Sequence, residues 1–212
     1  SSTSNLITLR IASLKLLGKI IDLYSNLKDP LYPDVSILDQ QQAQIMSTIT
    51  PSFNKESNVE LAGEGIVLSS KFISSNITNI KKAGRIIKIL TSSLEDLAST
   101  TKDKGANSSA ISSGSLRIGD IPILTNKSEN RIKIYVLQAW SRMLVLSDLN
   151  NNNNEELANL IHNYIKVLIS LWVYYLREFT MLKYADTETL ELDSTNEGLS
   201  LKIYEGCWID FV

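Results

Sequence analysis

The amino-acid sequence predicts an all-α fold, an irregular α-solenoid of antiparallel helical hairpins. Apolar residues recur at helical spacing along almost the whole 212-residue chain, and no segment shows the sustained alternation of apolar and polar residues that is typical of a strand. The patterns predict about six full helices followed by a truncated seventh. The chain also begins and ends inside helical patterns, which favours an open solenoid over a closed bundle.

Composition and charge narrow the classes of function. The chain is 43% hydrophobic, which is enough for a packed core, and its 21 basic residues are balanced by 23 acidic residues. A near-neutral charge provides no basic surface of the kind that nucleic-acid binders use, so we expect no nucleic-acid partner. One cysteine, Cys207, and one histidine, His162, cannot build a disulfide framework or a zinc cluster, which fits a reducing, cytoplasmic setting.

No segment predicts secretion or membrane insertion. The N-terminal residues SSTSNLITLR lack the basic region and the uninterrupted apolar core of a signal peptide, and they read as a cut through a longer protein. The most apolar run, Val167 to Leu176, is about half as long as the roughly 20 residues that cross a bilayer. We interpret this run as part of a buried helix.

The first helix is predicted over residues 5–27. Pro30 and Pro33 end it, because proline lacks an amide donor and disfavours helix in the residue before it. Its apolar residues form one stripe with a second beside it: Ile7, Ile11, Leu14 and Ile21, then Leu17, Ile20 and Tyr24.

The second helix is predicted over residues 36–50, with Asp39 as the capping-box partner of Ser36. It carries the glutamines of the stretch LDQQQAQIMSTITPSF. We expect its core side to consist approximately of Ile37, Leu38, Gln41, Ile45, Thr48 and Ile49. Gln40 and Gln44, with Gln41 at the margin, then lie mainly at the rim or in solvent, where glutamine can bond to a neighbouring helix without burying charge.

The third helix is predicted over residues 57–74 and begins with a stronger capping box, Ser57 and Glu60. It contains the sequence Gly-Glu-Gly at residues 63–65. These glycines lack the preceding strand, the third glycine and the lysine of a phosphate-binding loop. We interpret them as small residues that let two helices approach closely.

The fourth and fifth helices are predicted over residues 79–99 and 129–147. Their core stripes are Ile80, Ala83, Ile87, Leu90, Leu94 and Leu97 in the fourth, and Ile132, Tyr135, Val136, Ala139, Trp140 and Met143 in the fifth. Between them, residues 100–128 form an insertion rich in serine and glycine that is predicted to be mobile. Its part LRIGDIPIL is apolar enough to pack back onto the helices.

The sixth helix, predicted over residues 154–184, is the longest. One face carries Leu157, Leu160, Ile161, Tyr164, Leu168, Leu171, Trp172, Tyr175, Phe179 and Leu182. Four more residues widen this face and predict packing on several sides: Ile165, Ile169, Val173 and Leu176. An acidic linker follows at residues 185–203, and IYEGCWIDFV then resembles the opening of a seventh helix.

The six helices group into three antiparallel pairs. The pairs begin near residues 5, 57 and 129, with a fourth start near residue 204. These intervals exceed the roughly 40 to 47 residues of HEAT and armadillo units, and the long loops account for the excess. The predicted architecture is therefore one HEAT-like solenoid over residues 1–212, a fragment of a larger protein.

Few residues are candidates for a catalytic, cofactor-binding or metal-binding role. His162 is the single histidine, the residue type most often used as a general acid or base, but no serine or cysteine nucleophile with a recognisable elbow accompanies it. Cys207, beside Trp208, is interpreted as a small buried residue. The spacing of the linker acids matches no calcium loop: Asp186, Glu188, Glu191 and Asp193. We therefore assign no catalytic, cofactor-binding or metal-binding residue and expect no cofactor and no enzyme activity.

Two features are candidates for partner binding. A basic strip beside the apolar seam of the fourth helix is either a solvated face or a surface for acidic lipid or an acidic peptide: Lys81, Lys82, Arg85 and Lys88. Trp140 and Trp172 fall on apolar stripes and are interpreted as core anchors, with a peptide groove between hairpins as the alternative. The sequence does not identify the protein-binding residues.

Several stretches, in order along the chain, resemble one known family. They are LDQQQAQIMSTITPSF, the segment NVELAGEGIVLSSKFISSNITNIKKAGRIIKILTSSLEDL, then VLQAWSRMLV, VLISLWVYYLREFTML and YEGCWIDFV. Together they are similar to the large HEAT-repeat accessory proteins of the Golgi clathrin adaptor, a family with fungal members and the animal HEAT-repeat-containing protein 5 group. The serine-rich insertion and an asparagine tract depart from the family pattern and indicate a fungal member.

The resemblance implies a non-enzymatic scaffold segment in vesicle transport. Such a segment would help recruit or retain the type-one adaptor complex on trans-Golgi and endosomal membranes, with the adaptor and co-accessory proteins as partners. The full-length protein could self-associate, its membrane association would be indirect, and its location would be cytoplasmic and peripheral on these membranes. The alternative is a HEAT-type protein-binding segment of another class, such as a nuclear-transport receptor or a relative of a Golgi exchange factor.

Overall fold

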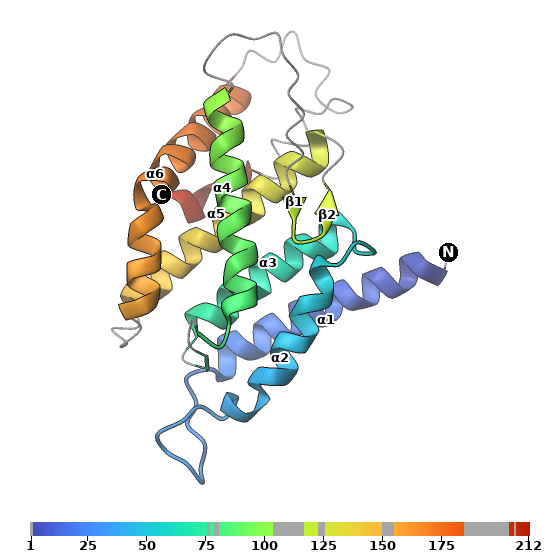
Figure 1. Ribbon diagram of the computed structural model, residues 1–212, viewed down its shortest axis with the longest axis vertical. Coiled ribbons are helices and arrows are strands. Elements are labelled where there is room, and N and C mark those ends of the chain that lie inside the picture. The colour runs from blue at the N-terminus through green and yellow to red at the C-terminus, as the bar shows by residue number, and fades with distance from the viewer. Residues whose placement is uncertain are drawn as a thin grey trace.

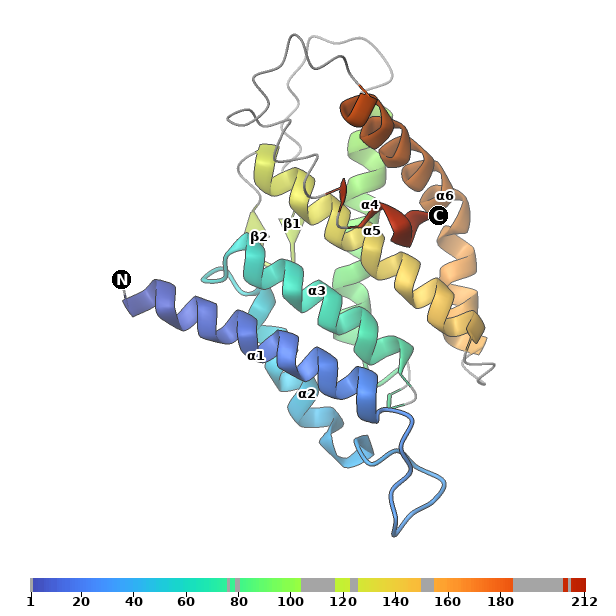
Figure 2. The same ribbon diagram turned by 180° about the vertical axis from the view of Figure 1, so that it is seen from behind.

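Six α-helices in two layers make up most of the described part of the structure, which is a computed structural model (Figure 1). It describes residues 2–75, 77–78, 81–103, 117–122, 126–149, 155–184, 204–205 and 207–212. The helices of one layer lie side by side and run in the same direction, as Figure 2 shows: α1 (Ser2–Tyr24), α3 (Val59–Ser74) and α5 (Asn126–Leu149). The second layer consists of α2 (Gln42–Ile49), α4 (Gly84–Asp103) and α6 (Glu155–Tyr184).

Shorter elements complete the described fold. Three are 3-10 helices: η1 (Asp39–Gln41), η2 (Thr50–Phe53) and η4 (Trp208–Phe211). Two are short strands that pair antiparallel: β1 (Arg117–Ile118) and β2 (Ile121–Pro122). Since successive helices return antiparallel and equivalent helices stack, the predicted all-α, HEAT-like solenoid is confirmed.

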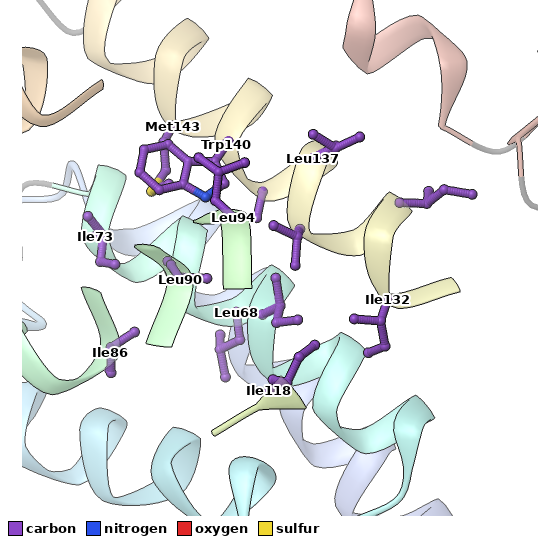
Figure 3. Packing of buried hydrophobic residues seen from close by; sticks show 14 of the residues in the cluster. Leu68, Ile73, Ile86, Leu90, Leu94, Ile118, Ile132, Leu137, Trp140 and Met143 are labelled. Atoms are coloured by element: carbon purple, nitrogen blue, oxygen red, sulfur yellow. The ribbon is translucent and has the colours of Figure 1, made fainter. Parts of the chain in front are cut away.

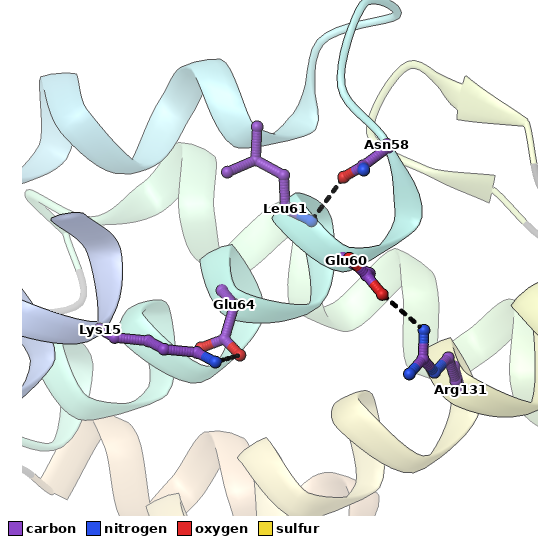
Figure 4. Close-up of polar contacts among 6 residues, drawn as sticks. All are labelled: Lys15, Asn58, Glu60, Leu61, Glu64 and Arg131. Carbon is purple, nitrogen blue, oxygen red and sulfur yellow. Dashed lines mark hydrogen bonds and ion pairs between the residues drawn. The ribbon is translucent and has the colours of Figure 1, made fainter. Parts of the chain in front are cut away.

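The central helix of the first layer is α3. Its buried residues surround most of the helix: Leu61, Ala62, Gly63, Gly65, Ile66, Leu68, Ser69, Ser70, Phe72, Ile73 and Ser74. Neighbours α1 and α5 cover different faces of it. Figure 4 shows an ion pair to each neighbour, from Glu64 to Lys15 of α1 at 3.4 Å and from Glu60 to Arg131 of α5 at 2.9 Å. The two flanking helices are therefore held through α3.

Two glycines of α3 lie at close contacts with other elements. A Cβ atom added to Gly63 would lie 2.5 Å from Cε2 of Tyr135 on α5. A Cβ atom added to Gly65 would lie 2.7 Å from Cβ of Ser52 in η2. Because real Cβ atoms do not approach this closely, the interpretation of these glycines as close-packing residues is confirmed.

The apolar core lies mainly between α3, α4 and α5 (Figure 3). The predicted stripe of the fifth helix is buried except for Tyr135, which is half-buried. In α4 the structure buries Leu90, Leu94 and Leu97 as predicted, and it buries Ala83 in the turn just before the helix. It also buries Ile86, whereas Ile87 is half-buried against the core and lines a small hollow that Leu160 of α6 lines too. Ile80 lies outside the described residues.

The start of α3 differs from the prediction by one residue. Asn58 is the N-cap, and its side chain accepts a hydrogen bond from the Leu61 amide at 2.8 Å (Figure 4). The predicted cap, Ser57, instead donates its hydroxyl to the carbonyl of Pro51 at 2.7 Å and closes the preceding turn. The predicted Ser57–Glu60 capping box is therefore wrong, since both side chains have other partners.

The second helix is also shorter than predicted, because η1 precedes it. With about three residues per turn, a 3-10 segment rotates the side chains relative to a continuous α-helix. Gln42 is consequently buried and donates to Asp39 Oδ1 at 2.6 Å. Ile37 (43% exposed) and Thr48 face solvent, so their predicted core positions are wrong. Gln40 and Gln44 are exposed as predicted, and so is Gln41, which the sequence predicts at the margin.

Part of the serine- and glycine-rich insertion is a β-hairpin that packs on α4 and on Phe53 of η2. Ile118 and Ile121 are 0% and 4% exposed, so the prediction that LRIGDIPIL packs back is confirmed. Gly119 has φ 56°, and the Asp120 amide donates to the carbonyl of Phe53 at 3.0 Å. The end of α4 and the start of α5 also fall within residues 100–128, while residues 104–116, 123–125 and the acidic linker 185–203 lie outside the described residues.

The C-terminal segment docks on α6 through aromatic side chains. Trp208 stacks on Phe179 with ring centroids 6.0 Å apart, and Tyr204 donates its hydroxyl to Glu178 at 3.0 Å. Tyr174 donates to the other oxygen of the same carboxylate at 2.8 Å. Where the sequence predicts the opening of a seventh helix, the structure has a helical turn at residues 204–205 followed by η4.

The sixth helix matches its predicted bounds within one residue, but one prediction about its packing is wrong. Ile169 and Val173 are 51% and 60% exposed, so the described elements do not surround the helix. The described neighbours α4, α5 and η4 leave these two side chains uncovered. Across the described residues, the helices fall short of the length and apolarity needed to cross a membrane.

Replacing Gly63 by alanine tests the close contact between α3 and α5. The new methyl group meets the ring of Tyr135, so we expect Gly63→Ala to lower the free energy of unfolding by about 1–3 kcal/mol. Urea denaturation followed by circular dichroism measures this change. The control is Gly84→Ala, since nothing lies within 4 Å of its added Cβ atom. Equal effects of the two substitutions would contradict the contact.

Removing the hydroxyl of Tyr204 tests the docking of the C-terminal segment. Tyr204 is 2% exposed, so Tyr204→Phe should lower the free energy of unfolding by roughly 1–2 kcal/mol through loss of its bond to Glu178. Tyr174→Phe removes the other phenol from the same carboxylate at a ring that is 38% exposed, and its effect should be smaller. Urea denaturation of both variants measures the two losses in free energy of unfolding and shows which is larger.

The same phenols predict a loss of stability at alkaline pH. Burial, followed by the bond to Glu178, raises the pKa of Tyr174 to about 12, and burial raises the pKa of Tyr204 further. The unfolded chain then loses these protons near pH 10, before the folded chain does, so stability falls as pH rises from about 10 towards 12. Urea midpoints between pH 8 and 11 measure this fall, which should be smaller in Tyr204→Phe.

Candidate protein-binding surface

The basic strip lies on the second layer, where α4 meets α6. Lys81 forms an ion pair with Glu156 of α6 at 2.9 Å, and this hydrogen bond raises the pKa of Lys81. Further along, the Tyr164 hydroxyl of α6 donates to Glu95 of α4 at 2.6 Å, which raises the pKa of Tyr164. These two polar contacts join α6 to α4 and to the turn at residues 81–83 that precedes α4.

Two members of the strip form no such link. Arg85 and Lys88 are exposed on α4 and take part in none of the ion pairs between described residues. Lys82 is exposed as well. The strip therefore contains one cation, Lys81, that links the turn before α4 to α6, and exposed cations on that turn and on α4. A solvated face and a surface for an acidic peptide both stay consistent with this geometry.

An apolar groove of about 290 Å³ lies between α5, α6 and the C-terminal end of η4. Its lining residues are Ser141, Leu144, Val145, Ile169, Trp172, Val173, Leu176, Phe211 and Val212. Ile169 and Val173, which the sequence pattern assigned to helix packing, form one wall of it. No local motif marks this groove, because its walls come from three segments that only the fold brings together.

Both internal tryptophans are core residues. Trp140 is fully buried and lies 5.4 Å from Tyr164 between ring centroids. Trp172 is 8% exposed, and its indole nitrogen donates to the carbonyl of Leu137 at 3.4 Å. The interpretation of both as core anchors is confirmed, although the edge of Trp172 also contributes to the apolar groove.

The candidate chemical residues do not come together. His162 lies on the exposed side of α6, and Cys207 is buried beside the carbonyl of Tyr204, as predicted for a small core residue. Within the described ranges, no three histidine, cysteine or acidic side chains are grouped so that they could hold a metal ion. The linker acids, from Asp186 to Asp193, lie outside those ranges. The described surface thus provides faces for contact rather than a pocket with convergent reactive groups.

Comparisons with known proteins identify the family. Residues 1–181 match the family described as the Laa1/Sip1/HEATR5 HEAT repeat region. The chain is 31% identical over 213 aligned residues to AP-1 accessory protein LAA1 of Saccharomyces cerevisiae (strain ATCC 204508 / S288c), covering 96% of this chain and 10% of that protein. No solved structure matches. The chain therefore spans about one tenth of this relative's length, and it belongs to the Laa1/Sip1/HEATR5 family of HEAT-repeat proteins.

Proposed function

We propose that this chain is a non-enzymatic scaffold segment of a clathrin-adaptor accessory protein. The observation that carries the proposal is the identity of 31% to a protein named AP-1 accessory protein, extending over 96% of this chain. In this role the polypeptide helps recruit or retain the type-one adaptor complex on trans-Golgi and endosomal membranes. Its partners are the adaptor complex and co-accessory proteins, and it is a cytoplasmic protein that reaches those membranes through them.

The geometry supports a scaffold more than a catalyst. Two stacked layers present long helix faces, whereas His162 is exposed and belongs to no cluster of three histidine, cysteine or acidic side chains among the described residues. The solvent-facing cations Arg85 and Lys88 and the apolar groove at Val173 are surfaces to which a protein segment could bind. The family match also favours this role over a nuclear-transport receptor or a relative of a Golgi exchange factor.

Recovery of partners from cell extract tests the proposal. The natural full-length polypeptide, tagged and immunoprecipitated, should recover subunits of the type-one adaptor, and the membrane-bound fraction of that adaptor should fall when the polypeptide is depleted. Re-expression of the full-length polypeptide is the control and should restore the membrane-bound fraction. Recovery of transport receptors or chromatin proteins without adaptor subunits would refute the proposal.

A further inference from the structure

The outer side of α4 carries a short positive surface. Arg85 and Lys88, in the first two turns of the helix, are exposed, and so is Lys82 in the turn directly before it. Residues three apart lie on the same side of a helix, so Arg85 and Lys88 are neighbours on one face. These three residues are here called the cationic face. Ser92 and Glu95 follow on the same side of α4, so the positive surface ends about one turn after Lys88.

The charge of the cationic face is not offset by the acidic groups beside it. Glu156 pairs with Lys81 at 2.9 Å, and Glu95 accepts the hydroxyl of Tyr164 at 2.6 Å. Arg85 and Lys88 take part in none of the ion pairs between described residues, and α4 has no acidic residue in its first turn. Like charges at neighbouring positions of a helix repel each other. Folding therefore leaves a repulsion at this face that a bound anion would relieve.

The cationic face lies on a side of the stack and not at one of its ends. Helix α4 is the middle helix of the second layer, between α2 and α6, and Figure 1 views it from its outer side, in front of α3 and α5. Further hairpins added to either end of the solenoid would lie beyond α2 or beyond α6. The outer side of α4 therefore stays open to a partner in a longer stack.

We propose that the cationic face binds a short, extended acidic segment of a partner protein, with carboxylates at alternate positions. The rise from Arg85 to Lys88 is about 4.5 Å, and alternate residues of an extended segment lie roughly 6.6 Å apart, so two long cationic side chains can each reach one carboxylate. The Arg85 guanidinium can bind a carboxylate through two parallel N–H donors. The inference rests on the proposed function in taking a protein as the ligand, and it adds the chemistry by which that ligand is recognised.

A protein segment fits this face better than an anionic membrane does. A bilayer meets a protein as a wide surface, and it would also approach the exposed carboxylates of Glu95 on α4 and of Glu155 and Glu156 on α6. Basic clusters that attract anionic lipid contain about 4–8 lysines and arginines, whereas the cationic face has three. A short peptide can contact Arg85 and Lys88 without meeting these carboxylates.

Peptide binding to the natural full-length polypeptide tests this proposal. The probe is a short fluorescent Glu-Ser repeat peptide, and fluorescence anisotropy measures its dissociation constant. Arg85→Gln combined with Lys88→Gln should weaken binding at least about tenfold, because each substitution removes a charge-assisted contact. The matched control is Lys19→Gln combined with Lys55→Gln, which removes the same charge from exposed positions away from α4 and should weaken binding less than about twofold.

The charge of the probe and the salt concentration provide further controls. A Gln-Ser repeat peptide of the same length should not bind, and binding of the Glu-Ser peptide should weaken as salt is raised, since screening acts on exposed charges. Binding of the Glu-Ser peptide that is unchanged by the substitutions at Arg85 and Lys88, or equally weakened by those at Lys19 and Lys55, would overturn the proposal.

Two further measurements separate this inference from its alternatives. If the substitutions at Arg85 and Lys88 reduce sedimentation with phosphatidylserine vesicles and leave peptide binding unchanged, the face binds membrane and the inference is overturned. Recovery of adaptor subunits by the unchanged polypeptide is scored separately. Its absence would refute the adaptor role whatever the peptide result, whereas failure of the peptide to bind overturns only the inference about the cationic face.

Discussion

The burial of α3 on several sides is the constraint on which the rest of the structure depends. A helix with neighbours on both flanks needs small residues where they approach, and Gly63 and Gly65 meet that need against Tyr135 and Ser52. It also needs every buried polar group to have a partner. Ser69 meets this need locally, because its hydroxyl donates to the carbonyl of Gly65 at 2.6 Å. The helix can thus be buried without polar groups contributed by its neighbours.

The position of α3 also connects the first helical pair to the inserted hairpin. Phe53, 3% exposed, lies beside Gly65 on one side and beside Gly119 on the other. At Gly119 a Cβ atom would lie 2.9 Å from the Phe53 carbonyl oxygen, and the positive φ there is a conformation that glycine adopts at little cost. A loop that is distant in sequence is therefore held against the first pair by one aromatic residue between two glycines.

The sequence predicts the helices well because their apolar stripes are long and regular. The predicted bounds of α6 and the burial of Trp140 follow from helical spacing alone. The predictions that are wrong depend on local hydrogen bonds and turns that helical spacing does not specify. Asn58 caps α3 because Ser57 bonds to Pro51 instead. A 3-10 helix before α2 changes which of its side chains face the core. The apolar groove has a different cause, since its walls come from segments whose contact depends on the packing of the C-terminal residues.

The outermost described helix of each layer, α1 in one and α6 in the other, has exposed apolar side chains, and this distribution bears on the proposed function. Leu16 on α1 and Val173 on α6 are both more than half exposed, although each belongs to a stripe with helical spacing. Exposed apolar surface of this kind marks contact sites with other protein elements, whereas the cations of α4 are suited to reversible, charge-dependent contact. A scaffold needs both kinds of surface: apolar ends that extend a rigid stack, and polar sides on which partners can bind and leave.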